Sequence, residues 1–169
     1  MASVRTRPVI VAGGGIGGLA AAQALALQGF DVKVLEQAPQ IGEIGAGIQL
    51  GPNAFAAFDA LGVGERMRSR AVYTERMELL DAIDESVVCS VRFDEAFRRR
   101  FGNPYAVIHR ADVHTSLLEG VQESGRVEVL THTRVERVEL RAEPVYNASN
   151  FTWGLVHLPV RIVPAHRRA

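Results

Sequence analysis

The sequence has little cysteine, little lysine and no excess of either charge. Cys89 is the only cysteine, which excludes an internal disulfide and an all-cysteine metal site. A single thiol is typical of a reducing compartment, so we expect a cytoplasmic protein. Cys89 lies in a run that is typical of a strand, Val87–Val91, where we expect it to be a small buried apolar side chain. Lys33 is the only lysine, which we attribute to codon usage rather than to function.

The balance of charges argues against two classes of partner. Arginine and lysine together number 19, and aspartate and glutamate also number 19, so the formal net charge is zero. A chain without net charge has no general electrostatic attraction to nucleic acid or to an anionic membrane. We therefore expect neither as a partner.

Metal-ligating residues are also sparse. His109 and His114 are five positions apart, and no third ligand lies near them in the sequence. This spacing gives no reason to expect a metal site. We expect His109 instead to support the backbone around Arg110.

One long uncharged run could be mistaken for a membrane segment. Residues 8–30 contain no charged side chain, and Arg5 and Arg7 precede them, as in a signal peptide or a membrane span. However, five glycines fall within residues 13–18, and they would break an apolar helix. The run also divides into a strand, a turn and a helix, so we expect no membrane segment.

The start of the chain is typical of a βαβ unit. Val9–Ala12 is a short apolar run, as expected of a buried parallel strand. Ile16–Gln28 is rich in alanine and leucine and predicts a helix that ends at Gly29. Asp31–Glu36 predicts the second strand, so that a right-handed crossover joins two parallel strands.

In the rest of the chain, predicted helices continue to alternate with predicted strands. This order predicts an α/β fold with a parallel sheet in one domain. Residues 37–51 are glycine-rich, and we expect them to be irregular. Beyond them, the predicted helices span 52–61, 65–69, 94–100 and 111–123, and the predicted strands span 77–81, 87–92, 106–109, 127–130 and 134–140.

The turn between the first strand and helix carries the pattern G-x-G-x-x-G at Gly13, Gly15 and Gly18. In a dinucleotide-binding unit, Gly13 permits the tight turn, Gly15 lets the backbone approach a pyrophosphate, and Gly18 lets the helix pack close to the sheet. Ile16 and Gly17 open the helix, whose first N–H groups and partial positive charge of about 0.5 favour phosphate. The surrounding strand and helix are the context that this motif requires.

An acidic residue, Glu36, closes the second strand 18 positions after Gly18. A carboxylate at this point can accept hydrogen bonds from both ribose hydroxyls of a dinucleotide, and it would repel a 2′-phosphate. The alternative interpretation is an ordinary solvent-exposed glutamate at a strand end. Neither the glycines nor Glu36 separates FAD from NAD.

Two later segments resemble the single-component flavoprotein aromatic hydroxylases, and in particular those that act on phenolic acids such as 3-hydroxybenzoate and salicylate. The first segment is Ile41–Leu50, continued by Gly51-Pro52-Asn53-Ala54. The second is Phe101–His114, whose His-Arg-Ala-Asp-Val-His resembles that family's His-Arg-Ala-Asp-Leu-His. The resemblance covers about residues 8–140 and implies a Rossmann-like FAD-binding domain.

The resemblance implies a role in FAD binding for three further parts of the chain. Gly45, Ala46, Gly47 and Ile48 would run as backbone along the ribityl chain and flavin ring, where a Cβ would hold the backbone away. Arg110 would bind the pyrophosphate or ribityl region through its planar guanidinium, although pairing with Asp112 is an alternative. Val135 would pack beside the adenine. No catalytic residue is assigned.

Two downstream motifs of the family are missing, since the sequence contains neither an Asp-Gly nor a Gly-Asp pair. We therefore expect an incomplete FAD-binding domain at 1–140, without the substrate domain. Residues 141–169 show no clear periodicity, and we interpret them as an atypical tail that is disordered or derives from a shifted reading frame or truncated gene.

The predicted function is the FAD-binding portion of a monooxygenase in aromatic catabolism. The complete enzyme would use NAD(P)H, O₂ and an aromatic acid, and the cofactor would supply the chemistry. We expect this chain to bind FAD weakly, to be inactive alone and to self-associate through an exposed sheet edge. One alternative is a non-catalytic FAD- or nucleotide-binding module that acts with a partner chain. Another, an NAD-dependent dehydrogenase fragment, is disfavoured by Gly45–Gly47 and Arg110.

Overall fold

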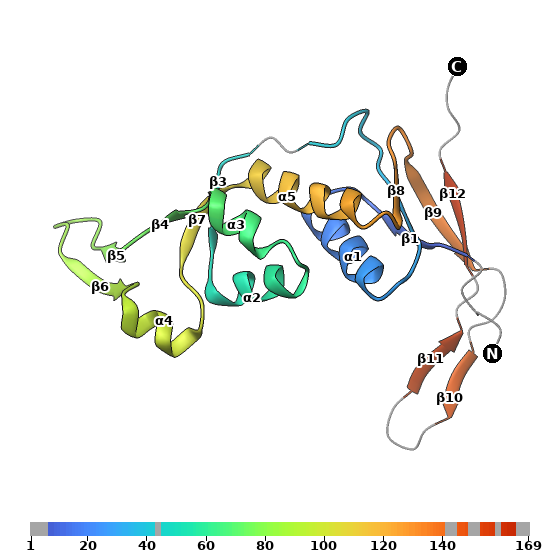
Figure 1. Ribbon diagram of the computed structural model, residues 1–169. Coiled ribbons are helices and arrows are strands. Elements are labelled where there is room, and N and C mark those ends of the chain that lie inside the picture. The colour runs from blue at the N-terminus through green and yellow to red at the C-terminus, as the bar shows by residue number, and fades with distance from the viewer. Residues whose placement is uncertain (1–6, 43–44, 141–144, 149–152, 158–159, 165–169) are drawn as a thin grey trace.

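A parallel sheet and two helices form the centre of the molecule. The computed structural model describes residues 7–42, 45–140, 145–148, 153–157 and 160–164. Strands β1 (Val9–Ala12), β2 (Val32–Leu35) and β8 (Val127–Leu130) are parallel, in the order β1-β2-β8. Helices α1 (Ile16–Leu27) and α5 (Arg110–Glu123) pack against each other, and α1 contacts all three strands (Figure 1).

A second sheet holds the other glycine-rich segment. Strand β7 (Ala106–His109) lies between β3 (Gly47–Leu50) and β4 (Val72–Tyr73) and is antiparallel to both. Pro52 then starts α2 (Pro52–Ala60), where its missing N–H costs no hydrogen bond. The short α3 (Gly64–Arg70) packs against α2.

One hydrophobic core joins these layers. Helix α5 buries Val113, Leu117 and Val121, which recur every four residues and so lie on one face. The buried hydrophobic cluster consists of Leu19, Ala22, Val32, Val34, Leu50, Phe55, Phe58, Val63, Met67, Ala106, Ile108, Val113, Leu117 and Val121.

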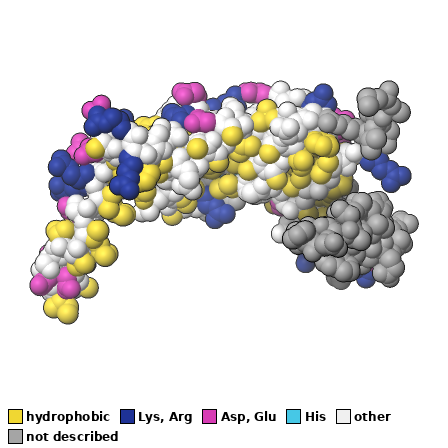
Figure 2. All heavy atoms as spheres, turned by 90° about the horizontal axis from the view of Figure 1, so that it is seen from below, with side chains coloured by type: hydrophobic (Ala, Val, Ile, Leu, Met, Phe, Trp, Pro, Cys, Tyr) yellow, Lys and Arg dark blue, Asp and Glu magenta, His cyan; other side chains and the backbone are white. Residues whose placement is uncertain are grey.

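A hairpin projects from one end of the molecule. It comprises β5 (Arg76–Leu80) and β6 (Val87–Arg92), followed by α4 (Glu95–Phe101) (Figure 1). Hydrophobic side chains are visible on this projecting end (Figure 2). Cys89 is exposed here, so the prediction that it is buried was wrong. A two-stranded ribbon has no second layer of its own to cover it.

Three strands follow the segment that resembles the hydroxylases. Strand β12 (Val160–Pro164) pairs antiparallel with β9 (Val135–Leu140), and β10 (Val145–Ala148) pairs antiparallel with β11 (Trp153–His157). The periodicity of the sequence predicted none of the last three strands. The other parts of the predicted tail, 141–144, 149–152, 158–159 and 165–169, lie outside the described residues.

The predicted α/β fold with a parallel sheet is confirmed. Strand β3 was not predicted, because its glycine and glutamine obscure any alternation, and it forms only by pairing with β7. Strand β4 was also missed, since it has two residues. Within the described part of the chain, no helix is both long enough and apolar enough to span a membrane.

Candidate functional site

The glycine turn after β1 depends on two of its glycines for its shape. Gly13 has a φ of +103°, which side-chain-bearing residues rarely adopt, and its N–H donates to the carbonyl oxygen of Leu35 at 2.8 Å. A Cβ added to Gly18 would overlap the carbonyl oxygen of Gly13. Both positions therefore require glycine for reasons within the protein itself.

The first turn of α1 is left without an acidic partner from its own sequence. Gly15 is the N-cap, no side chain caps it, and the first turn contains no acidic residue. A Cβ added to Gly17 would meet no atom within 4 Å. The first turn of α1 therefore has no capping side chain and has open space beside Gly17, as expected of an anion-binding helix start.

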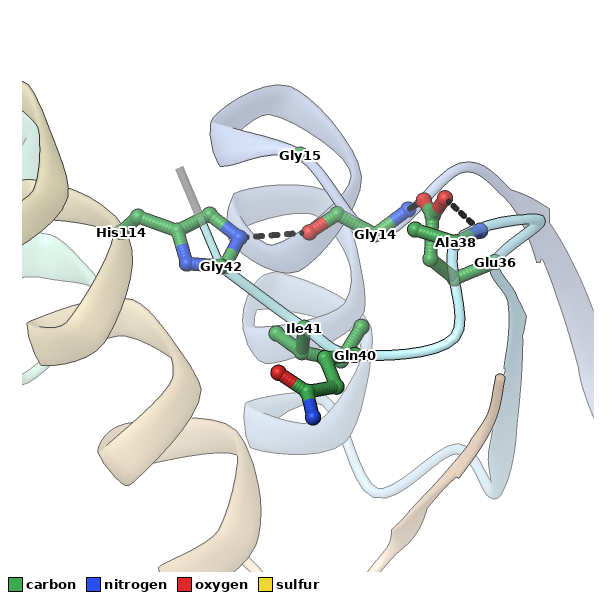
Figure 3. A pocket seen from close by; sticks show the side chains of 8 residues that line it. All are labelled: Gly14, Gly15, Glu36, Ala38, Gln40, Ile41, Gly42 and His114. Atoms are coloured by element: carbon green, nitrogen blue, oxygen red, sulfur yellow. Dashed lines mark hydrogen bonds between the residues drawn. The ribbon is translucent and has the colours of Figure 1, made fainter. Parts of the chain in front are cut away.

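Glu36 lies directly after β2 and connects the strand end to the glycine turn. Its Oε2 accepts a hydrogen bond from Gly14 N at 2.5 Å, and its Oε1 accepts one from Ala38 N at 2.8 Å (Figure 3). These two N–H groups, that of Ala38 first, hold the pKa of Glu36 below its usual range. The carboxylate is therefore ionised at neutral pH and retains oxygen lone pairs for further donors.

Two cavities adjoin Glu36. The larger, of about 330 Å³, is lined by Gly14, Gly15, Glu36, Ala38, Gln40, Ile41, Gly42 and His114 (Figure 3). The smaller, of about 210 Å³, is lined by Ala12, Gly13, Leu35, Glu36, Gln37, Thr133 and Val135. Thr133 N donates to Glu36 O at 2.8 Å, which holds the segment before β9 against the end of β2. Val135 is thereby brought beside the glycine turn.

The second predicted group, Gly45–Ile48 with Arg110, is assembled by β3 and β7. Gly47 pairs with His109 and Ile48 with Ile108, and Arg110 N donates to Ala46 O at 3.2 Å. A Cβ added to Gly45 would lie 3.1 Å from Arg110 Cδ. The backbone of this segment therefore runs closely along the Arg110 side chain.

The two histidines at the start of α5 have different partners. His109 Nδ1 accepts a hydrogen bond from Ala111 N at 3.3 Å, so it caps the helix that carries Arg110, in agreement with the predicted support. His114 is 2% exposed, and its Nε2 lies 2.7 Å from the carbonyl oxygen of Gly14. Sequence reasoning assigned no role to His114. The one sequence feature that could have indicated such a role is its position one helical turn after Arg110.

Comparison with known proteins identifies the family. The sequence profile described as an FAD-binding domain matches residues 6–147. The chain belongs to the FAD-binding domain family. The family binds FAD, so the match agrees with the predicted cofactor and with the predicted α/β fold.

Two curated relatives are 3-hydroxybenzoate 6-hydroxylases. That of Polaromonas naphthalenivorans (strain CJ2) is 73% identical over 132 residues, which are 78% of this chain and 33% of the relative. That of Klebsiella oxytoca is 51% identical over 136 residues, covering 80% of this chain and 34% of the relative. The chain thus spans about a third of the length of the curated relatives it matches.

A solved structure has the same fold. The tetrameric form of 2-methyl-3-hydroxypyridine-5-carboxylic acid oxygenase aligns with a TM-score of 0.68 and 25% identity. The alignment covers 94% of this chain and 38% of that chain. The curated relatives and the solved structure therefore both agree with the resemblance to aromatic-ring oxygenases that the sequence motifs indicated.

The residues present fit FAD. The open space at Gly17 and the uncapped start of α1 suit a pyrophosphate, while the ionised Glu36 suits ribose hydroxyls. Val135 lies beside the same cavity as Glu36. Among the described residues, no three histidine, cysteine or acidic side chains cluster in a way that could hold a metal ion.

Proposed function

We propose that this chain forms the FAD-binding part of a monooxygenase that hydroxylates a phenolic acid of the 3-hydroxybenzoate or salicylate type. The observation that carries the proposal is the 73% identity, over 132 residues, to a 3-hydroxybenzoate 6-hydroxylase. FAD, when bound, would supply electron transfer from NAD(P)H to O₂ for the hydroxylation. The chain itself would bind and orient the cofactor.

We assign the binding residues in two groups. The first group would hold the adenosine and pyrophosphate: Gly13, Gly15, Ile16, Gly17, Gly18, Glu36 and Val135. The second would follow the ribityl chain and flavin ring: Gly45, Ala46, Gly47, Ile48 and Arg110. The cavities beside Glu36 and the close approach of Gly45 to Arg110 support these assignments.

A chimera tests whether this chain can serve as the FAD-binding part of such an enzyme. Residues 1–140 of this chain would replace the corresponding third of the Polaromonas enzyme, and NADH oxidation with and without 3-hydroxybenzoate would be measured. We expect substrate-dependent NADH oxidation and a hydroxylated product. A folded chimera that binds FAD but does not hydroxylate 3-hydroxybenzoate would contradict the proposed role in a monooxygenase of this type. A chimera that binds no FAD would contradict the proposed site.

The chain alone provides a simpler test of cofactor binding. We expect the purified protein to bind added FAD weakly, with a shift of the visible flavin bands and quenching of flavin fluorescence. Addition of NAD first should not prevent the shift. No spectral change at FAD concentrations up to the millimolar range would contradict FAD binding by this part of the molecule.

We further propose that residues 1–140 form the functional unit and that residues 141–169 are a tail from a shifted reading frame or a truncated gene. The loss of clear periodicity after Leu140 supports this division. The family match ends at residue 147, seven residues beyond that point. Sequencing the genomic locus tests it. A single frame that encodes this tail, with no alternative continuation of the hydroxylase sequence, would contradict it.

A second candidate is a non-catalytic FAD-binding module that acts with a partner or with a second copy. The observation that favours it is the exposed apolar surface of the β5–β6 hairpin, which includes Leu79, Ile83 and Val88. Size-exclusion chromatography with light scattering would measure self-association. A strictly monomeric chain that retains stoichiometric FAD would contradict this candidate.

A further inference from the structure

His114 is a buried polar side chain that the proposed cofactor contacts leave unexplained. It lies on α5, among the apolar side chains that pack this helix against α1, and it is 2% exposed. Burying an imidazole is unfavourable unless its polar atoms find partners. Its Nε2 finds one in the carbonyl oxygen of Gly14 at 2.7 Å. Helix α5, which lies far from the glycine turn in the sequence, therefore contacts that turn at Gly14.

The identity of the donor follows from the partner. A carbonyl oxygen can only accept a hydrogen bond, so Nε2 of His114 must carry the hydrogen. The ring therefore donates to Gly14 in its neutral Nε2–H form and equally in its protonated form. The contact depends on an N–H group at this point rather than on a particular charge.

Gly14 is held from both sides. Its N–H donates to Glu36 and its carbonyl oxygen accepts from His114, and Figure 3 shows these two side chains on opposite sides of Gly14. A Cβ added here would lie 2.8 Å from Ile41 Cδ1 and 3.2 Å from Glu36 Oε2, so it would displace the Ile41 side chain and crowd the carboxylate. The two hydrogen bonds therefore fix the two peptide groups that flank Gly14.

The second of these peptides contains the N–H of Gly15. In a trans peptide the C=O and N–H point in opposite directions. A hydrogen bond that holds the Gly14 carbonyl toward α5 therefore aims the Gly15 N–H away from α5. Gly15 is the N-cap of α1 and lines the larger cavity beside Glu36.

We propose that His114 is a positioning residue for the phosphate-binding turn: its Nε2–H orients the Gly14–Gly15 peptide so that the Gly15 N–H faces the pyrophosphate of FAD. The inference rests on the proposed cofactor site, and it gives His114, which lines the larger cavity beside Glu36, a role that acts through the Gly14–Gly15 peptide. It also links α5, which carries Arg110, to the glycine turn. The two proposed groups of binding residues would thereby be set relative to each other through one helix.

The test compares three variants of the full chain. His114→Leu keeps much of the volume but removes the donor, while His114→Gln places an N–H close to the position of Nε2. Ser116→Ala is the matched control, because Ser116 is also buried on α5 but bonds to Asp112 O and Arg70 rather than to the glycine turn. Calorimetric titration with FAD and with ADP gives the affinities, and thermal unfolding of the FAD-free chain gives the stability.

We expect His114→Leu to weaken FAD and ADP by about the same factor, roughly tenfold, as for a lost hydrogen bond that orders a binding group. His114→Gln should restore both affinities to within about threefold. Ser116→Ala should lower the unfolding temperature and leave both affinities unchanged. At saturating ADP, the amide signal of Gly15 in ¹⁵N-labelled protein should shift by similar amounts in the wild type and in His114→Gln, and by less in His114→Leu.

The possible outcomes distinguish the positioning role of His114 from the proposed FAD site on which it rests. If the wild type binds neither FAD nor ADP, the proposed cofactor site fails. If the wild type binds both and His114→Leu binds them equally well, the positioning role fails while the cofactor site stands. If His114→Gln loses as much affinity as His114→Leu and both unfold at lower temperature than Ser116→Ala, His114 is a packing residue and the positioning role is overturned.

Discussion

The two glycine-rich segments of the proposed site need their glycines for different reasons. In the turn of residues 13–18, the requirement is internal, because Gly13 has a positive φ and Gly18 lies against the Gly13 carbonyl. In β3 and the residues before it, Gly45 and Gly47 have no positive φ, and Gly45 lies against the flexible side chain of Arg110. The first segment therefore needs its glycines for the fold, whereas the second would need them for the proposed contact with the cofactor.

We expect the largest loss of stability from Gly18→Val, because the valine side chain would overlap the carbonyl oxygen of Gly13. Backbone cannot move aside as a side-chain tip can, so we expect a loss of at least about 3 kcal/mol in the free energy of unfolding. Urea denaturation followed by circular dichroism measures it.

Gly17→Ala is the matched control for this change. An added Cβ at Gly17 meets no atom within 4 Å, and alanine favours a helix over glycine by about 1 kcal/mol. We expect equal or higher stability together with weaker FAD binding. A stability loss for Gly17→Ala as large as that for Gly18→Val would refute the proposed distinction between the two positions.

The next largest effect should come from Glu36→Gln. A glutamine offers one acceptor oxygen, so it cannot serve both Gly14 N and Ala38 N as the two carboxylate oxygens do. We expect a loss of about 1–2 kcal/mol in stability and an affinity for FAD weakened by about tenfold or more. Denaturation and fluorescence titration provide the two values. Unchanged FAD affinity would argue against a ribose contact.

The pKa of Glu36 predicts a change of stability with pH. Because its pKa in the folded chain lies below the unfolded value, the folded state binds fewer protons at this residue. Its contribution to stability is complete above the unfolded pKa and is lost as the pH falls through the folded one. The unfolding free energy of wild type minus Glu36→Gln should therefore shrink in the acidic range. A difference that stays constant with pH would contradict this origin.

The smallest effect should come from Gly45→Ala. The added Cβ would lie 3.1 Å from Arg110 Cδ and 3.2 Å from Arg110 Cβ, so the arginine side chain and the backbone that carries it must give way by a few tenths of an ångström. We expect a stability change below about 0.5 kcal/mol and a loss of FAD affinity of about two- to fivefold. Both follow from thermal unfolding and titration.

Gly47→Ala provides a second test of whether the cofactor or the protein itself requires glycine in this segment. Its Cβ would meet only the Ile108 carbonyl oxygen, at an ordinary distance of 3.9 Å, so the protein itself tolerates it. A loss of FAD affinity without a loss of stability would show that the cofactor needs this space. A large loss of stability in either variant would mean that the second segment, like the first, supports the fold.

Local signals in the sequence predicted most elements near the site. Val9–Ala12 forms the predicted parallel strand, but its side chains are only partly buried or exposed, so the expected full burial was wrong. Gly29 marks the end of α1 through its positive φ of +79°. The same signals could not find β3, because a strand with glycine and glutamine forms only when β7 supplies its partner. They also gave the wrong environment for Cys89, since alternation within a strand does not say whether a second layer covers it.

Residues close together in the chain were enough to predict the βαβ unit, the glycine turn, the acid at Glu36 and the likeness to flavoprotein hydroxylases. Three further features appear only when distant segments pack together: Val135 lies beside the glycine turn, Gly45 runs along Arg110, and His114 contacts Gly14 across one hundred residues of sequence. The physical reason is that a hydrogen bond such as the one from His114 requires two distant backbones to be packed to within about 3 Å, and spacing in the sequence contains no such distance.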